Sequence, residues 1–431
     1  MPITDRRAPD TAHSFLNPLT ILLLFVASVL TWAQIKQRTM MSDAITQAGP
    51  EARLIELRWA LGGKFGFNPE ISSKIPENQW TMAVETVLFS EFGHVMESQE
   101  RLKYTPEGAF RVCWEAAYNS GPVPSDLELA QVREGLSDGL AYKCLESSFM
   151  AKKSHQAAAE LRSDALRHYK ARALGILAVL IVLFTAALFG IWTGIRMLSN
   201  CEPMPDSPDF QMPAIYAVNV CLGWYTVFLL SATVIALMNN IVQMGLWALP
   251  AAYLLHAVSG TAFICVAERA SPLMLWKKIS TKNRLWLSSG TRFLFLALGS
   301  VLILTVFLSF FMPDGDAPQR DMVNFIRTNR GIGSFLVIFG TVALLGPFFE
   351  EVFFRGFLLS VMRRWMSVWW ALAFSSVMFG AIHFQAQALP VLTVLGGVLG
   401  LAFVRTNDVK TAIFVHGCWN GGVFLFQKLL Y

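Results

Sequence analysis

The sequence of 431 residues is poor in charge: Asp, Glu, Lys and Arg together make up 15% of it, whereas hydrophobic residues make up 54%. Soluble globular domains contain about 25% charged residues, so this composition excludes an ordinary soluble domain as the main part of the chain. The formal net charge of +5 does not indicate nucleic-acid binding. The Lys and Arg residues lie in short clusters beside apolar runs, without a basic patch interleaved with aromatic residues. We therefore expect a lipid bilayer as a partner and no nucleic acid.

The sequence also lacks the patterns of several common cofactor and metal sites. It contains no Walker loop and no Rossmann fingerprint, and its six cysteines have neither CxxC nor zinc-finger spacing. Two of them, Cys113 and Cys144, lie in the one long polar segment, where an oxidising compartment would allow a disulfide. Two separate buried thiols fit the same sequence, so both alternatives stay open.

Long apolar runs are abundant. A helix that crosses the hydrocarbon core needs about 20 mostly apolar residues. Segments that approach this pattern are residues 19–33, 173–195, 212–238, 245–266, 286–312, 335–362, 369–384, 389–404 and 412–426. The predicted fold is therefore an all-α, polytopic transmembrane bundle of about eight or nine spans, with a mostly helical soluble insertion between the first two.

Four regions follow from this pattern. Residues 1–35 form a tail and the first transmembrane helix, which we interpret as a signal anchor, although cleavage of a signal peptide fits as well. Residues 36–170 form a mostly helical soluble domain, and its last part is expected to continue as one helix into the second span. Residues 171–312 hold spans two to five, and residues 330–431 hold the remaining core.

The charges beside the spans predict the orientation. The densest basic loop contains Arg269, Lys277, Lys278, Lys282 and Arg284. Short loops rich in Lys and Arg lie in the cytoplasm. Counting spans back from these loops places the amino terminus inside and residues 36–170 outside a plasma or inner membrane.

One apolar span contains three ionisable residues in the run GPFFEEVFFRGF. Each such group costs roughly 2.5 to 3.5 kcal/mol in the middle of a membrane helix, so it indicates function. Glu351 and Arg355 are four residues apart, a spacing that predicts an intrahelical ion pair. Glu350 points about 100° away and is available as a base or ligand. Pro347 is expected to kink the helix nearby.

The following spans contribute histidines. Phe379 and His383 are four residues apart in one apolar span, and His416 and Asn420 repeat this spacing in the last one. A lone histidine, such as His256, is more often a packed helix residue. Two histidines in spans near a double glutamate instead indicate a site.

Measured from the nearest basic loops, His416 lies about 9 Å deep and His383 about 28 Å deep. The two depths approach each other if residues 365–370 lie in the membrane interface.

This set of groups predicts hydrolysis by an activated water. A buried glutamate and a histidine can hold and deprotonate a water, and Asn420 with His416 could stabilise an oxyanion. A zinc ion held by Glu350, His383 and His416 could activate the same water. The residues leave both chemistries open, and no other cofactor is indicated.

The segments EEVFFR, FGAIH and HGCWN resemble the motifs EExxxR, FxxxH and HxxxN of the CAAX protease and bacteriocin-processing family of membrane endopeptidases. The resemblance covers about residues 335–426. It implies that Glu350 is the general base, supported by Glu351 and Arg355, and that His383 shares the water. It assigns oxyanion stabilisation to His416 and Asn420, and shaping of the pocket to Phe379.

The predicted function is hydrolysis of a peptide bond in a membrane-associated protein or peptide by an enzyme resembling CAAX prenyl proteases. A transporter that uses the buried Glu and His residues, and a non-catalytic membrane scaffold or chaperone, are the alternatives. The soluble insertion is not part of the family's common core and could bind a substrate or a partner. The sequence does not determine the oligomeric state.

Overall fold

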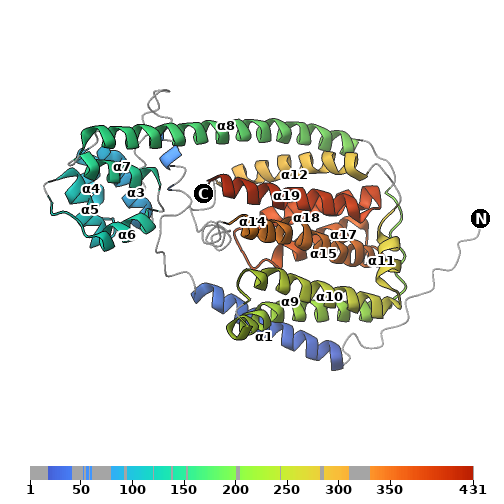
Figure 1. Ribbon diagram of the computed structural model, residues 1–431. Helices are drawn as coiled ribbons and strands as arrows, with labels where there is room; N and C mark the ends of the chain where they lie inside the picture. Colours follow the sequence, from blue (N-terminus) through green and yellow to red (C-terminus); the bar gives the residue numbers. More distant parts are fainter. Residues whose placement is uncertain are drawn as a thin grey trace, which may run out of the picture. The chain divides into compact units, whose positions relative to one another are not determined.

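The computed structural model describes residues 18–40, 52, 55–57, 59–60, 79–91, 95–119, 121–136, 139–151, 154–199, 204–242, 244–281, 286–309 and 331–430. Every regular element within these ranges is a helix (Figure 1). The predicted tail before residue 18, much of residues 41–78, and the end of the predicted span 286–312 lie outside the described residues. The chain divides into two compact units, Met1–Thr39 with Leu183–Lys428 (unit 1) and Met40–Val182 with Leu429–Tyr431 (unit 2).

Unit 2 is a small helical domain that contains most of the predicted soluble region. Its helices are α3 (Gln79–Glu91), α4 (Val95–Leu102), α5 (Ala109–Tyr118), α6 (Asp126–Gly135), α7 (Leu140–Ala151) and the first part of α8 (His155–Ser199). Helix α6 begins with a capping box, in which the Ser125 hydroxyl accepts from the Glu128 backbone N–H and the Glu128 carboxylate accepts from the Ser125 N–H. As expected, α8 continues without interruption from this region into the second predicted span.

The disulfide considered for Cys113 and Cys144 is not formed. Both cysteines are free, and both are buried in the core of unit 2 on helices α5 and α7. Burial raises the pKa of each thiol to about 12, because an apolar interior disfavours the thiolate. The alternative of two separate buried thiols therefore describes the structure.

Unit 1 is the membrane bundle. Its helices are α1 (Pro18–Met40), the end of α8, α9 (Ala214–Val242), α10 (Ala248–Glu268), α11 (Pro272–Ile279), α12 (Trp286–Ser309), a segmented helix over residues 332–362, α17 (Val368–Ala381), α18 (Leu389–Thr406) and α19 (Val409–Leu430). Among the described residues, six helices are long and apolar enough to cross a membrane, and Leu19–Thr31 and Val368–Ala381 are shorter apolar helices. The chain is an all-α, multi-pass membrane protein.

Helix α1 packs against α9 through polar contacts. The Thr20 hydroxyl donates to the Asn219 side-chain oxygen at 2.7 Å, and the hydroxyls of Thr31 and Tyr225 are 2.9 Å apart. Many large apolar side chains face outward elsewhere in the bundle, as is typical of helices that contact lipid. Phe184, for example, is 54% exposed on α8.

The helix that carries the double glutamate is irregular on both sides of it. It consists of α14 (Ile332–Phe339), a π-helical segment (Gly340–Leu345), α15 (Gly346–Glu351), a second π-helical segment (Val352–Leu359) and α16 (Ser360–Met362). The helix widens just before Pro347, where the Gly346 N–H donates to the Thr341 carbonyl five residues earlier. The kink expected at Pro347 stays a prediction. Such π segments often occur at functional sites.

The three basic loops lie at one end of the bundle. Arg364 donates to the Met212 carbonyl at 2.8 Å, and the neighbouring Gln211 N–H donates to Glu268 at 2.9 Å. Lys410 donates to the Thr281 carbonyl at 2.7 Å. These contacts join the loops around Glu268–Thr281, Arg363–Arg364 and Lys410 at the same end, as a shared membrane face requires.

Candidate active site

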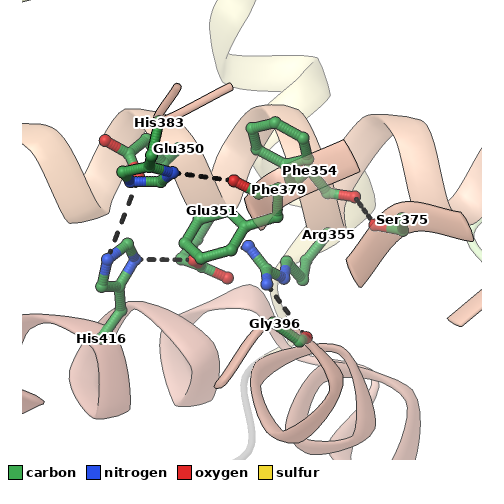
Figure 2. A network of polar contacts seen from close by, with 9 residues as sticks. All are labelled: Glu350, Glu351, Phe354, Arg355, Ser375, Phe379, His383, Gly396 and His416. Atoms are coloured by element: carbon green, nitrogen blue, oxygen red, sulfur yellow. Dashed lines mark hydrogen bonds and ion pairs between the residues drawn. The ribbon is translucent and has the colours of Figure 1, made fainter. Parts of the chain in front are cut away.

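The predicted pair of Glu351 and Arg355 lies at the centre of unit 1, and both side chains are fully buried. Arg355 Nη1 donates to Glu351 Oε1 at 2.9 Å, and Nη2 donates to the Gly396 carbonyl of α18 at 3.0 Å (Figure 2). The Arg355 guanidinium also lies 4.4 Å from the centre of the Phe379 ring, a cation–π contact. The buried charge of Arg355 is therefore stabilised by three partners: a carboxylate, a backbone carbonyl and an aromatic ring.

Glu351 has a second partner that spacing along the chain could not reveal. His416 Nδ1 lies 2.8 Å from Glu351 Oε1, and only 2% of the His416 side chain is exposed. Because a carboxylate oxygen accepts, Nδ1 carries the hydrogen in this bond. Glu351 thereby fixes the His416 ring and directs its Nε2 away from Arg355, toward Glu350.

Glu350 occupies a different environment from its neighbour. Its side chain is 14% exposed, and its Oε2 lies 3.9 Å from His416 Nε2. This separation exceeds a direct hydrogen bond and is suited to a bridging water. Glu350 also lines a small cavity between α9, α10 and its own helix, with room for about one water molecule.

Phe379 and His383 approach the same cluster from α17. The Phe379 ring is buried and lies 5.5 Å from the His416 ring and 5.2 Å from the His383 ring, between centres. His383 was expected to lie within the predicted span 369–384. Helix α17 ends at Ala381, however, so His383 lies in the turn that follows it. Its Nδ1–H donates to the Phe379 carbonyl at 2.8 Å.

Asn420 has a partner outside this cluster. Its amide donates to the carbonyl of Val342, in the first π segment, at 3.2 Å. The amide nitrogen carries a second hydrogen. Glu350, Glu351, Arg355, Phe379 and His416 therefore form one contact network, which His383 joins through Phe379, while Asn420 fastens α19 to the irregular helix.

Close backbone packing makes this geometry possible. A Cβ atom on Gly417 would lie 2.7 Å from the Ala343 carbonyl oxygen, so glycine lets α19 approach the first π segment beside His416. A Cβ on Gly396 would lie 3.1 Å from Ser376 Cα and 3.2 Å from Phe379 Cδ1. Gly396 therefore allows close helix packing and also supplies the carbonyl that accepts from Arg355.

The conditional zinc site of Glu350, His383 and His416 receives no support from the geometry. In the part of the chain that the structure describes, no three His, Cys, Asp or Glu side chains are placed to hold a metal ion together.

Comparisons with known proteins match the part of the chain that contains this site. Residues 332–422 match the family described as type II CAAX prenyl endopeptidase Rce1-like. The chain is 28% identical over 85 residues to the membrane peptidase candidate YdiL of Bacillus subtilis, covering 20% of this chain and 35% of YdiL. It is 32% identical over 94 residues to the membrane-embedded CAAX protease MroQ of Staphylococcus aureus, covering 20% of this chain and 38% of MroQ. No solved structure matches the chain.

The site lies within the part of the chain that is similar to membrane peptidases, and it is built from glutamate, histidine and arginine on neighbouring helices. For residues 332–422, these matches agree with the resemblance to the CAAX protease and bacteriocin-processing family that the three motifs carry. The matches span little more than a third of the length of either relative, and residues 1–331 lie outside the family match.

Proposed function

We propose that this protein is an intramembrane endopeptidase that hydrolyses a peptide bond with a water activated by Glu350. The observation that carries the proposal is the different placement of the two adjacent carboxylates. Glu351 is saturated at Oε1 by Arg355 and His416. Glu350 faces a cavity and lies 3.9 Å from the nitrogen of His416 that Glu351 does not bind.

In the proposed reaction, a water binds beside Glu350 and gives it a proton while the water oxygen attacks the carbonyl carbon of the substrate. The lone pair of His383 Nε2 can accept the second hydrogen of this water and orient it. Glu350 then returns the proton to the leaving amine as the C–N bond breaks. The products are a new carboxylate and a new amine.

The attack places a negative charge on the substrate oxygen, which needs donors. His416 can supply an Nε2–H when its ring is protonated, and the positive charge would be matched because the cluster holds two carboxylates and one arginine. The second hydrogen of the Asn420 amide is the other proposed donor. Preorganised donors of this kind typically contribute about 10²–10³-fold in rate.

The proposed substrate is a membrane-associated protein or peptide, because the reacting groups lie among apolar spans. The test compares the termini of membrane proteins, by mass spectrometry, in cells that carry the wild type or Glu350→Gln. Products that require Glu350 would support a glutamate-dependent protease. The matched control is Glu160→Gln, an equal change on an exposed part of α8.

Two identical sets of termini would contradict the proposal and favour a non-catalytic scaffold. Loss of the products in the Glu160→Gln control as well would show that they do not report on the site. Because Glu350→Gln keeps the shape of the side chain, we expect the variant to accumulate to the wild-type level.

We also propose the orientation of the chain in the membrane. The amino terminus and the basic loops lie inside, and residues 36–170 lie outside. It is supported by the shared end of the three basic loops. A membrane-impermeant thiol reagent should label Val123→Cys and not Lys277→Cys in intact cells, both made in a Cys418→Ser background because Cys418 is exposed. The opposite labelling would reverse the orientation.

A further inference from the structure

Helix α10 contributes a histidine that neither the sequence motifs nor the family match includes. His256 is 6% exposed and lies outside residues 332–422. Its ring contacts Phe228 at 5.4 Å and Tyr253 at 5.3 Å, between ring centres. These contacts alone would describe the packed helix residue that the sequence led us to expect.

Two further observations do not fit simple packing. His256 Nδ1 is buried and has no hydrogen-bond partner among the described residues. The Ala252 backbone, one turn earlier, interacts with the imidazole as a hydrogen-bond acceptor, but its geometry falls short of a hydrogen bond to Nδ1. His383 shows the completed form of such a bond, 2.8 Å from Nδ1 to the carbonyl of Phe379. A buried polar atom without a partner is costly, so native structures usually supply one, often a water.

The cavity beside His256 is the one that Glu350 lines. Its walls include Trp224 from α9, His256 and Gly260 from α10, and Phe349, Glu350 and Phe353 from the irregular helix. The Trp224 ring stacks on Phe353 with centres 3.9 Å apart. A Cβ atom on Gly260 would lie 2.3 Å from Trp224, so glycine leaves the space that this ring needs. The walls are aromatic or apolar except for a few groups, of which Glu350 and His256 are ionisable.

We infer that His256 is a positioning residue, whose Nδ1 hydrogen-bonds a water held in this cavity and shared with Glu350. His416 lies 3.9 Å from Glu350 Oε2, so the carboxylate would be oriented by imidazoles from two helices. A water that binds both Nδ1 and the carboxylate satisfies the unpartnered nitrogen and restrains the Glu350 rotamer. The inference rests on the proposed function for its kinetic consequence, but not for the contact itself.

The contact is tested without activity. In full-length protein labelled with ¹⁵N-histidine and held in lipid nanodiscs, the ring nitrogen resonances of His256 are assigned by their loss in His256→Phe. We expect Glu350→Gln to shift the His256 Nδ1 resonance and Glu160→Gln to leave it in place. An Nδ1 resonance that is indifferent to Glu350→Gln would overturn the inference.

The kinetic test uses a peptide that spans the cleavage site revealed by a Glu350-dependent product. We expect His256→Phe, which keeps a ring but loses both nitrogens, to lower kcat by about tenfold, as the loss of one hydrogen bond implies, with little change in KM. His256→Asn places an amide near the Nδ1 position and should recover more activity than His256→Gln, whose amide lies near Nε2. The packing control is Phe228→Leu, which alters a ring neighbour of His256 and leaves its nitrogens.

The outcomes separate the two proposals. Equal losses in Phe228→Leu and all three His256 variants would assign His256 to packing and overturn the inference, while Glu350-dependent products would keep the protease. If no Glu350-dependent product exists but the Nδ1 resonance responds to Glu350→Gln, the proposed function fails and the shared water stands. If His256→Phe does not fold, the Asn and Gln variants supply both the assignment and the rates.

Discussion

Glu91 and Glu351 both have buried side chains that bind an arginine, yet only Glu351 belongs to a candidate site. In unit 2, Glu91 accepts from Tyr118 at 2.8 Å and Ser148 at 2.9 Å, and pairs with Arg162 at 2.8 Å. Both of its oxygens are used, and the Arg162 side chain remains 42% exposed. In unit 1, Glu351 Oε1 is shared by a fully buried arginine and a histidine, while its Oε2 has no partner among the described residues.

The difference shows that a buried acid–arginine pair does not by itself indicate chemistry. Around Glu91 the network is complete: burial, and then the charge of Glu91, raise the pKa of Tyr118 well above its usual value, so the phenol stays a neutral donor. Around Glu351 the network passes through His416 to a second carboxylate that faces a cavity. A chain of titratable groups that ends at a cavity is what distinguishes the candidate site.

The largest expected effect compares Glu350→Gln with Glu91→Gln. Loss of the general base should reduce the rate of product formation by about 10²–10⁴-fold, whereas the same change at Glu91 should leave the rate within about twofold once folded protein is matched. Quantitative measurement of the new termini over time gives both rates. Equal losses would mean that the rate reports stability and not chemistry.

The next effect concerns stability. Glu351→Ala leaves Arg355 charged and fully buried, which should cost about 3–5 kcal/mol of unfolding free energy. Glu91→Ala should cost less, about 1–3 kcal/mol, because Arg162 can turn to water. Unfolding of the purified protein in detergent measures both, and adding Arg355→Leu to Glu351→Ala should recover part of the loss. No recovery would contradict the assignment of the cost to the stranded arginine.

A smaller effect is expected from the approach of α18 to α17. Gly396→Ala places a methyl group 3.1 Å from Ser376 Cα and should cost about 1–3 kcal/mol by overpacking. At Gly397 the nearest neighbour of an added methyl would be Ser376 Oγ at 3.7 Å, an ordinary contact. Thermal unfolding should therefore separate Gly396→Ala from Gly397→Ala. Similar midpoints would show that the helices can move apart at little cost.

The smallest effect lies in the thiols of unit 2. Because burial raises the pKa of Cys113 and Cys144 to about 12, the protonated thiols stabilise the folded state fully below their usual pKa near 9, and this contribution is lost as pH rises from 9 to 12. Between pH 9 and pH 12 the unfolding free energy of the wild type should therefore fall more than that of the double variant Cys113→Ala, Cys144→Ala. Denaturant unfolding at pH 8 and pH 10 measures the difference, and parallel pH dependence would contradict it.

The positions of the helices could be predicted from the sequence better than the contacts between them. Over most of its described length, each of the nine apolar runs coincides with a helix, because lipid requires each peptide group to be bonded within its own helix. The Glu351–Arg355 pair was also predictable, since four residues of helix bring them together. The bond from Glu351 to His416 joins residues 65 apart in sequence, and no local period encodes it. The unpartnered nitrogen of His256 depends on packing among three helices and was equally hidden.

The mismatch in depth between His383 and His416 has a physical resolution in α17. The helix has 14 residues and rises about 21 Å, against a hydrocarbon core of about 30 Å. The polar turn that contains His383 would then lie within the depth of such a core, where a bilayer must thin or admit water. A hydrolase needs water as its second reactant, and in the proposed enzyme this short helix would give bulk water a local route to the depth of Glu350.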